Sequence, residues 1–184
     1  MPNRDPVVTC MLLPPQSSIG KIYGRVDLSD SYSVTLPPGT CHDPEILARF
    51  VFSRRARWMD LLMAVRDVAV SAFGLKTSTQ LVGVETAAQG ERIAIFRIFH
   101  VDKREIILGE DDSHLDFRIS VLHLPAEEPE SESRLVVSTV VHCHNRLGRT
   151  YLRIITPFHR VIVRSILRRA ARNRWPSELA GTVT

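Results

Sequence analysis

Two stretches in the last third of the chain, His114–Leu124 and Arg134–His144, alternate between apolar and polar residues. A period of two predicts half-buried β-strands. In the stretch that follows, Asn145–Arg174, apolar residues recur at spacings of three and four, which is the period of an amphipathic helix. The pattern therefore predicts a ribbon of strands that leads directly into one long final helix.

Three further segments have the pattern of strands. Ser31–Leu36 alternates until Pro37-Pro38-Gly39 ends it, and residues 92–98 and Glu105–Leu108 precede the two long runs. We predict turns at Asp102-Lys103 and Gly109–Ser113, and a longer acidic loop over residues 125–133. Short connections of this kind favour antiparallel neighbours.

Two helices are predicted between the first strand and the later ones. Asp43-Pro44-Glu45 has the pattern of a helix start, because an N-cap acid is followed by a proline and by an acid near the positive end of the helix dipole. A second amphipathic helix is predicted over residues 57–72.

The final helix begins at an expected N-cap, Asn145, and Pro157 is expected to kink it. Its predicted buried stripe consists of Leu147, Tyr151, Ile154, Ile155, Phe158, Ile162, Ile166 and Ala170.

Length and composition favour one domain. A chain of 184 residues with 44% hydrophobic content is long enough for one core and short for two. We divide it into an irregular segment over 1–30, a domain over 31–174 and a flexible tail over 175–184. The net charge is +4, but it is unevenly placed: Asp102–Glu132 holds ten acids, whereas Ser133–Ser177 holds ten arginines and no acid.

Cysteine usage and hydropathy indicate a cytoplasmic protein. Cys10, Cys41 and Cys143 are few and widely spaced, which does not indicate a disulfide framework or a thiolate zinc site. The apolar run Val7–Leu13 is too short for a signal peptide, and no stretch approaches the roughly 20 apolar residues that cross a bilayer. We therefore expect a soluble protein with no transmembrane segment.

The order strand, two helices, antiparallel strands and long final helix fits an α+β helix-grip fold, in which a curved antiparallel sheet wraps around the last helix. Other α+β sandwiches fit the same order. Several short blocks, in sequence order, also resemble a bacterial family known as domain of unknown function 2867, over roughly residues 30–172. The blocks are Arg57-Trp58-Met59, Leu62-Met63, Arg66-Asp67, Gly109–Asp112, His114–Arg118, Gly148–Tyr151 and Pro157–His159.

This resemblance implies membership of the helix-grip superfamily (SRPBCC), with START lipid-transfer domains, polyketide cyclases and birch-pollen-allergen-like proteins. It implies a fold and an apolar cavity between sheet and last helix, but no reaction. Relatives of the family also occur fused behind nucleotide-binding, epimerase-like domains. This chain has no Gly-rich dinucleotide fingerprint, so that partner's chemistry is not carried over and no cofactor is predicted.

The leading functional hypothesis is a small-molecule-binding protein that holds an apolar or amphipathic ligand under the last helix. His159 is the expected polar anchor, because a residue after the kink can donate to a ligand oxygen. The expected wall consists of Phe117, Ile119, Thr139, Val141, Tyr151, Ile155 and Phe158.

A rival hypothesis is a cyclase- or hydrolase-like enzyme that uses His114 with Asp111 or Asp112 as an acid–base pair. A solvated acidic turn, in which Asp116 contacts neighbours such as Arg118, explains the same residues, and we favour it.

His142 and His144, at i and i+2 on a strand, share a face and have the spacing of zinc ligands. A site would need His159 or Asp116 as well. We favour polar strand-end residues and predict no metal.

The arginines at the end of the last helix allow peripheral contact with anionic membranes or binding to phosphates. A solvated helix face explains them as well, since cations are favourable at a helix C-terminus. The segment lacks aromatic residues at base-stacking spacing, so nucleic acid is the weaker partner. A third possibility is an accessory interaction module without a ligand, docking through this helix. The oligomeric state stays open.

Overall fold

The computed structural model describes residues 6–52, 91–126 and 131–177 of the chain. The helix predicted over residues 57–72 lies outside these ranges. The elements, in chain order, are β1 Thr9–Met11, the 3-10 helix η1 Ser18–Lys21, β2 Leu28–Thr35, α1 Pro44–Phe52, β3 Arg92–Ile93, β4 Phe96–Val101, β5 Glu105–Asp111, β6 Leu115–Leu124, β7 Arg134–Cys143 and α3 Arg146–Arg172.

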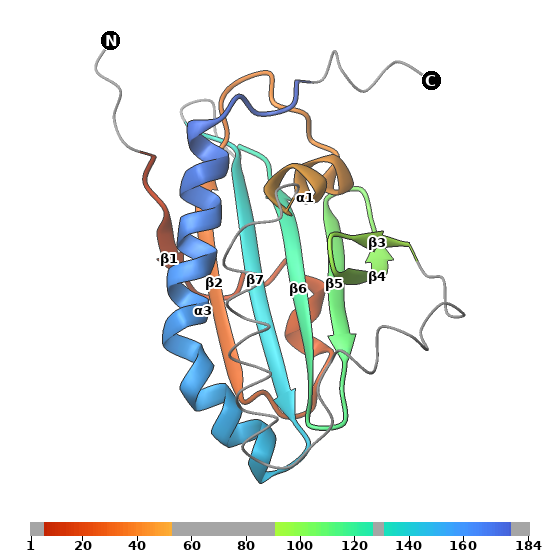
Figure 1. Ribbon diagram of the computed structural model, residues 1–184. Helices are drawn as coiled ribbons and strands as arrows, with labels where there is room; N and C mark the ends of the chain where they lie inside the picture. Colours follow the sequence, from red (N-terminus) through yellow and green to blue (C-terminus); the bar gives the residue numbers. More distant parts are fainter. Residues whose placement is uncertain (1–5, 53–90, 127–130, 178–184) are drawn as a thin grey trace.

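The strands form one sheet in the order β1-β2-β7-β6-β5-β4-β3, and every neighbouring pair is antiparallel (Figure 1). Strand β2, which precedes α1, therefore lies beside the last strand, β7. From β7 outward, strands β6, β5, β4 and β3 follow in reverse sequence order. This architecture confirms the α+β class and the antiparallel ribbon that runs into a final helix.

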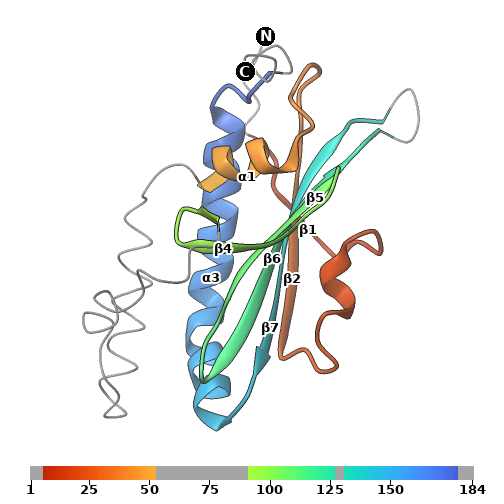
Figure 2. The same cartoon turned by 90° about the vertical axis from the view of Figure 1, so that its right-hand side faces the viewer.

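Helices α1 and α3 cover one face of the sheet, and the segment that contains η1 covers the other (Figure 2). We call these the helix face and the η1 face. On β7, Leu135 and Val137 belong to the core under the helices, whereas Val140 packs with Ile19 of η1. Alternate residues of this valine-rich strand therefore serve two separate cores, which periodicity alone could not assign.

The β3–β4 end of the sheet curls toward the helix face (Figure 2). Residues 92–98, predicted as one strand, form a tight hairpin whose turn includes Ala94 at φ 56°. A β-bulge between Ile98 and His100 then bends β4, as bulges do. The curl brings Phe96 against Phe52 of α1, with ring centroids 5.5 Å apart.

Two predicted boundaries are wrong for identifiable reasons. Residues 1–30, treated as irregular, contain β1 and η1, and β2 already begins at Leu28. The polar run Ser29–Ser31 hides the start of that strand because its serines face η1 rather than the main core. The turn predicted over Gly109–Ser113 begins later, since β5 continues to Asp111.

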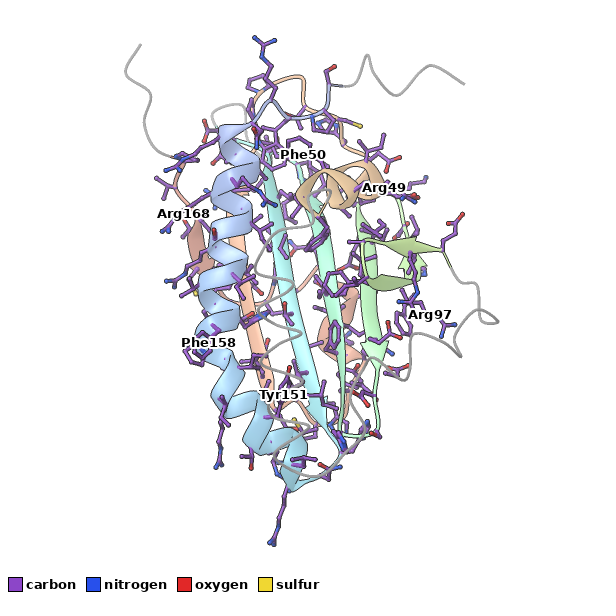
Figure 3. All side chains as sticks on the ribbon, in the orientation of Figure 1. Arg49, Phe50, Arg97, Tyr151, Phe158 and Arg168 are labelled. Atoms are coloured by element: carbon purple, nitrogen blue, oxygen red, sulfur yellow. The ribbon has the colours of Figure 1, made fainter. Side chains whose placement is uncertain are left out.

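The final helix begins as predicted, because the Asn145 side chain accepts a hydrogen bond from Gly148 N at 2.9 Å. A Cβ added to Gly148 would lie 2.2 Å from the carbonyl oxygen of His114, so only glycine lets the helix start this close to β6. Pro157 lies inside the helix, and Figures 1 and 3 show the axis changing direction near Phe158.

The predicted buried stripe of this helix needs correction. Ile154 and Phe158 are 53% and 48% exposed. Apolar residues occupy more than one side of the helix, so periodicity alone does not choose the side that packs. The residues buried in the structure are Gly148, Leu152, Ile155, Ile162, Val163, Ile166, Leu167 and Ala170.

Candidate functional site

A carboxylate lies between the sheet and the last helix. Asp30 alternates along β2 with Tyr32 and Val34, so its side chain points to the helix face, where it is 7% exposed. Nε2 of His159, two residues after Pro157 on α3, lies 3.3 Å from Asp30 Oδ1. The sheet and the final helix thus supply one member each of a carboxylate–imidazole pair.

The second oxygen of this carboxylate is open. Asp30 Oδ2 is buried and has no hydrogen-bond partner among the residues that the structure describes. Arg160 is a cation close to this oxygen: its Nε lies 4.0 Å away on a side chain that is 54% exposed. Burying a charged oxygen without a hydrogen bond costs free energy, because the lost hydration is not replaced. Asp30 Oδ2 therefore has the capacity to accept a further hydrogen bond.

Thr139 lies directly beside Asp30. The two residues are Cα partners in the β2–β7 ladder, so their side chains share the helix face, and Thr139 is 4% exposed. Next along the same strand, Val141 belongs to a separate apolar cluster. Its members are Leu28, Leu115, Phe117, Val141, Cys143, Tyr151, Leu152 and Ile155. Asp30 and Thr139 thus border an apolar surface under α3.

Most of the predicted wall falls on this side of the sheet. Phe117, Val141, Tyr151 and Ile155 are in the apolar cluster, and Ile119 belongs to the main helix-face core. Thr139 and His159 border it. Phe158 lies outside, because at 48% exposed it projects from the outer side of α3.

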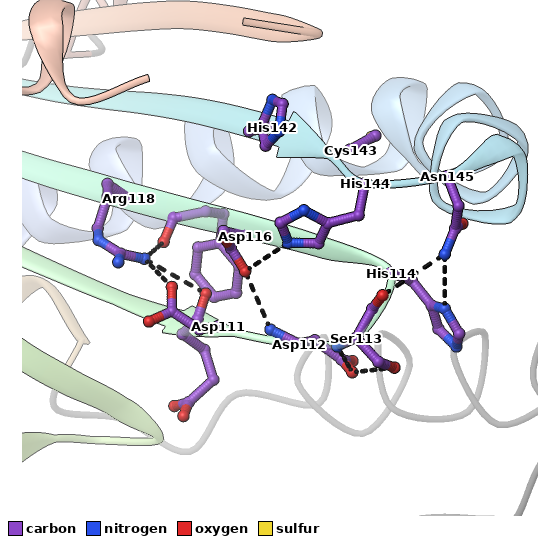
Figure 4. A network of polar contacts seen from close by, with 12 residues as sticks. Asp111, Asp112, Ser113, His114, Asp116, Arg118, His142, Cys143, His144 and Asn145 are labelled. Carbon is purple, nitrogen blue, oxygen red and sulfur yellow. Dashed lines mark hydrogen bonds and ion pairs between the residues drawn. The ribbon is translucent and has the colours of Figure 1, made fainter. Parts of the chain in front are cut away.

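The residues of the rival acid–base hypothesis are arranged differently (Figure 4). Asp111 pairs with Arg118 at 2.7 Å rather than with His114. Asp112 accepts from Ser113 N at 2.6 Å, and the ring of His114 points toward Asn145, with Nδ1 3.3 Å from its Nδ2. The geometry favours a capped turn over a catalytic pair.

The predicted histidine pair shares one face, as its spacing requires. The rings of His142 and His144 lie 5.2 Å apart, and His144 Nε2 contacts Asp116 Oδ1 at 3.0 Å. His142 Nδ1 lies 2.9 Å from the carbonyl oxygen of Arg25. His159 is on the other face and cannot join them. Within the described ranges, no group of three or more His, Cys, Asp or Glu side chains is arranged to hold a metal ion.

The η1 face contains a second buried carboxylate, Glu105, which is 3% exposed. It accepts from Ser17 Oγ at 2.6 Å, from Ser18 N at 2.9 Å and from Ser120 Oγ. Burial raises the pKa of Glu105, but these hydrogen bonds together outweigh burial, and the pKa lies below its ordinary value. This carboxylate fixes the η1 segment to the sheet.

Tyr23 packs beside the charged groups of the η1 face. Its ring stacks on His142 at 5.6 Å, and its buried hydroxyl has no hydrogen-bond partner within the described part of the chain. Burial raises the pKa of Tyr23 to about 12, although the Arg118 guanidinium acts to lower it.

The alternation along β2 marks Asp30, although the first strand was predicted to begin only at Ser31. Extending the alternation of Tyr32 and Val34 backward by two residues places Asp30 on the same face as the core. A charged residue at a core position of a strand marks a functional candidate, because such positions are normally apolar.

None of the helices in the described ranges combines the length and apolar character that crossing a membrane requires.

The fold and the site define an α+β protein with a single antiparallel sheet and a polar pair beneath its final helix. Residues 22–166 match the family model described as "Protein of unknown function (DUF2867)". The match covers most of the chain, so the protein belongs to this family. No curated protein and no solved structure matches it.

Proposed function

We propose that the protein binds a small amphipathic molecule between the sheet and α3, with the polar end of the ligand on Asp30 and His159. The observation that carries this proposal is the buried Asp30 Oδ2, which has no hydrogen-bond partner among the described residues. A donor group on a ligand would satisfy it, and the adjacent apolar cluster would contact the rest of the molecule.

We further propose that the fold is a helix-grip fold. Three features support this: the strand before α1 lies next to the last strand, the sheet curls at its β3–β4 end, and the final helix lies along the same face as α1. In such a fold the space beneath the last helix is the natural place for a ligand.

The chemistry of the site specifies the polar end of the ligand. An ionised carboxylate only accepts hydrogen bonds, so Asp30 Oδ2 requires a hydroxyl or an amine rather than a second carboxylate. A ligand carboxylate within hydrogen-bond distance of Asp30 would be repelled by it. Because the ionised carboxylate only accepts, His159 Nε2 must donate to Asp30 Oδ1, and the other ring nitrogen, Nδ1, is the one that can contact a ligand.

The test is a binding screen with matched amphipaths that share one apolar body and end in an amine, a hydroxyl or a carboxylate. Native mass spectrometry and tryptophan fluorescence report binding. We expect the amine and the alcohol to bind and the acid not to bind. Asp30→Asn should weaken the amine most, since it removes the charge from the acceptor.

Asp116→Asn is the matched control, because Asp116 also pairs with a histidine but lies on the η1 face. It should leave binding unchanged. The proposal fails if none of the three amphipaths binds, or if Asp30→Asn and Asp116→Asn have equal effects.

A second candidate function is acid–base catalysis at the same pair. It is favoured by the 3.3 Å contact between Asp30 and His159, since a carboxylate that orients an imidazole is a common general-base arrangement. It differs from the cyclase- or hydrolase-like hypothesis in using this pair instead of Asp111, Asp112 and His114. Conversion of a bound amphipath, lost in His159→Gln while binding persists, would identify an enzyme; unchanged ligand after prolonged incubation would identify a carrier.

We also propose a cytoplasmic location. Cys10, Cys41 and Cys143 are all free thiols, which supports a reducing compartment.

A further inference from the structure

Three large apolar side chains line up on the outer side of α3. Ile154, Phe158 and Val161 are 53%, 48% and 68% exposed, and their spacings of four and three residues place them on one side of the helix. We call these three residues the outer row. A protein surface seldom exposes several large apolar residues in a line without a partner for them.

Arginines border this row along most of the helix. The exposed arginines of α3 are Arg146, Arg153, Arg160, Arg164, Arg168 and Arg172. Arg164 lies over the ring of Tyr32, with its Cζ atom 5.3 Å from the ring centroid. Figure 3 shows Arg168 in the upper part of the helix. No acid occurs between Ser133 and Ser177, so α3 itself carries no carboxylate, and Arg160 lies 4.0 Å from Asp30 of β2.

We propose that the outer face of α3 docks on an anionic lipid surface. Apolar side chains bordered by cations on one exposed helix face are what such a surface binds: the apolar groups enter the acyl boundary and the cations contact the headgroups. The outer row consists of three residues. It is small compared with a stable protein–protein interface, which buries about 800 Å² on each partner. The inference does not depend on the proposed ligand, because the outer row is exposed on the side of the helix away from the sheet; Arg160 is shared, since its Nε lies 4.0 Å from Asp30 Oδ2.

Cosedimentation of the full chain with vesicles tests the docking. Vesicles of phosphatidylcholine alone are compared with vesicles of phosphatidylcholine and phosphatidylserine, at low and physiological salt. We expect binding to the anionic vesicles only, weakening as salt rises. Equal binding to both vesicle types, or no binding to either, would overturn the proposal.

The double variant Arg153→Gln with Arg168→Gln tests the charges without altering the contacts of Arg160 or Arg164. At about fivefold for each cation, vesicle affinity should fall roughly 25-fold. Arg97→Gln with Arg134→Gln removes the same charge from exposed strand positions and should have little effect. An equal loss in both double variants would show non-specific attraction and overturn the assignment to α3.

The double variant Phe158→Ser with Val161→Ser tests insertion of the outer row, and we expect about a tenfold loss of affinity. Val101→Ser is the control, since Val101 is also exposed, at 46%, but lies on β4. Unchanged affinity in the first variant would contradict insertion. Light scattering of the protein without lipid tests self-association as the alternative. If the chain self-associates, the arginine variant abolishes this, and no vesicles bind, then the partner of α3 is a second copy of the chain and not a membrane.

Discussion

Glu105 and Asp30 are buried carboxylates on opposite faces of the sheet, and their hydrogen bonding differs. On the η1 face, Glu105 accepts hydrogen bonds from Ser17, Ser18 and Ser120. On the helix face, Asp30 has one contact with His159 and an oxygen without a hydrogen-bond partner in the described part of the chain. Burial is similar, but hydrogen bonding is complete in one case and incomplete in the other.

This difference separates a structural group from a group suited to binding. A fully bonded carboxylate stabilises the segments that supply its donors, and its removal leaves several donors unsatisfied. A partly bonded carboxylate costs stability in the free protein, a cost that persists where function requires it. The comparison therefore predicts opposite effects on stability from similar substitutions on the two faces.

The largest effect is expected for Glu105→Ala. Three donors lose their acceptor: Ser17 just before η1, Ser18 of η1 and Ser120 of β6. The free energy of unfolding should therefore fall by about 3 kcal/mol. Chemical denaturation measures the loss. Glu110→Ala is the control, because among the described residues the Glu110 side chain makes a surface pair with Arg92, at 3.2 Å, whose loss should change stability by about 0.5 kcal/mol or less. Equal effects would remove the distinction drawn for Glu105.

Gly148→Ala should be the next largest. The added Cβ meets the His114 carbonyl oxygen at 2.2 Å, so the start of α3 must move away from β6, at a cost of about 2 kcal/mol. The same variant should weaken amphipath binding, since it displaces the helix that holds His159. Gly24→Ala is the matched control: its Cβ meets nothing within 4 Å and should be nearly neutral. Thermal unfolding of both variants decides.

Acid should weaken the η1 face through Glu105. Its pKa is lower in the fold than in the unfolded chain, where it is about 4.3. The ionised form is therefore favoured by folding, and the stability it contributes is present above the unfolded pKa and lost as the pH falls through the folded pKa. The difference in free energy of unfolding between wild type and Glu105→Gln should narrow below about pH 4. A constant difference down to the folded pKa would contradict this.

Asp30→Asn should act in the opposite direction. The substitution keeps the shape of the side chain and removes a buried charge with an open oxygen, so we expect a gain of about 1 kcal/mol, or a few degrees in Tm. The same variant should lose affinity for amines. A clear loss of stability would show that Asp30 is a structural group like Glu105.

The smallest effect concerns Tyr23. Its folded pKa of about 12 lies above the value of about 10 expected for an unfolded chain, so folding favours the neutral phenol. The stability linked to this group is complete below about pH 10 and is lost as the pH rises toward about 12. Burial also raises the pKa of Tyr32, so tyrosinate absorbance should show a late-titrating fraction that decreases in Tyr23→Phe without disappearing, with little change in stability at neutral pH.

The sequence predicted elements with strong periodicity well. The long strands β6 and β7, the start of α1 and the Asn145 cap of α3 lie at or within one or two residues of their expected positions. Features set by tertiary packing escaped it. Ala94 adopts a positive φ that no local rule requires, and β1 is only three residues long.

The candidate site was predictable in part. Position after the kink pointed to His159, which lies 3.3 Å from Asp30. Thr139 and Val141 lie on the helix face of β7, but the sequence left open which face of that strand looks inward, since both faces carry valines. The partner of His159 was missed because Asp30 lies in a polar run that did not have the pattern of a strand. Phe158 was placed on the wrong side, since the direction in which α3 packs depends on contacts with the sheet rather than on its own period.

The pairing of β2 with β7 has a consequence for the biosynthesis of the chain. Tyr32 and Val137 face each other across the ladder but lie 105 positions apart in the sequence. At typical rates of translation, β2 emerges roughly 5–20 s before its partner strand exists. During that interval β2 has β1 beside it, but neither β7 nor α3 is present to bury Tyr32 and Val34. The nascent chain is thus open to chaperones and to aggregation until β7 and α3 have been made.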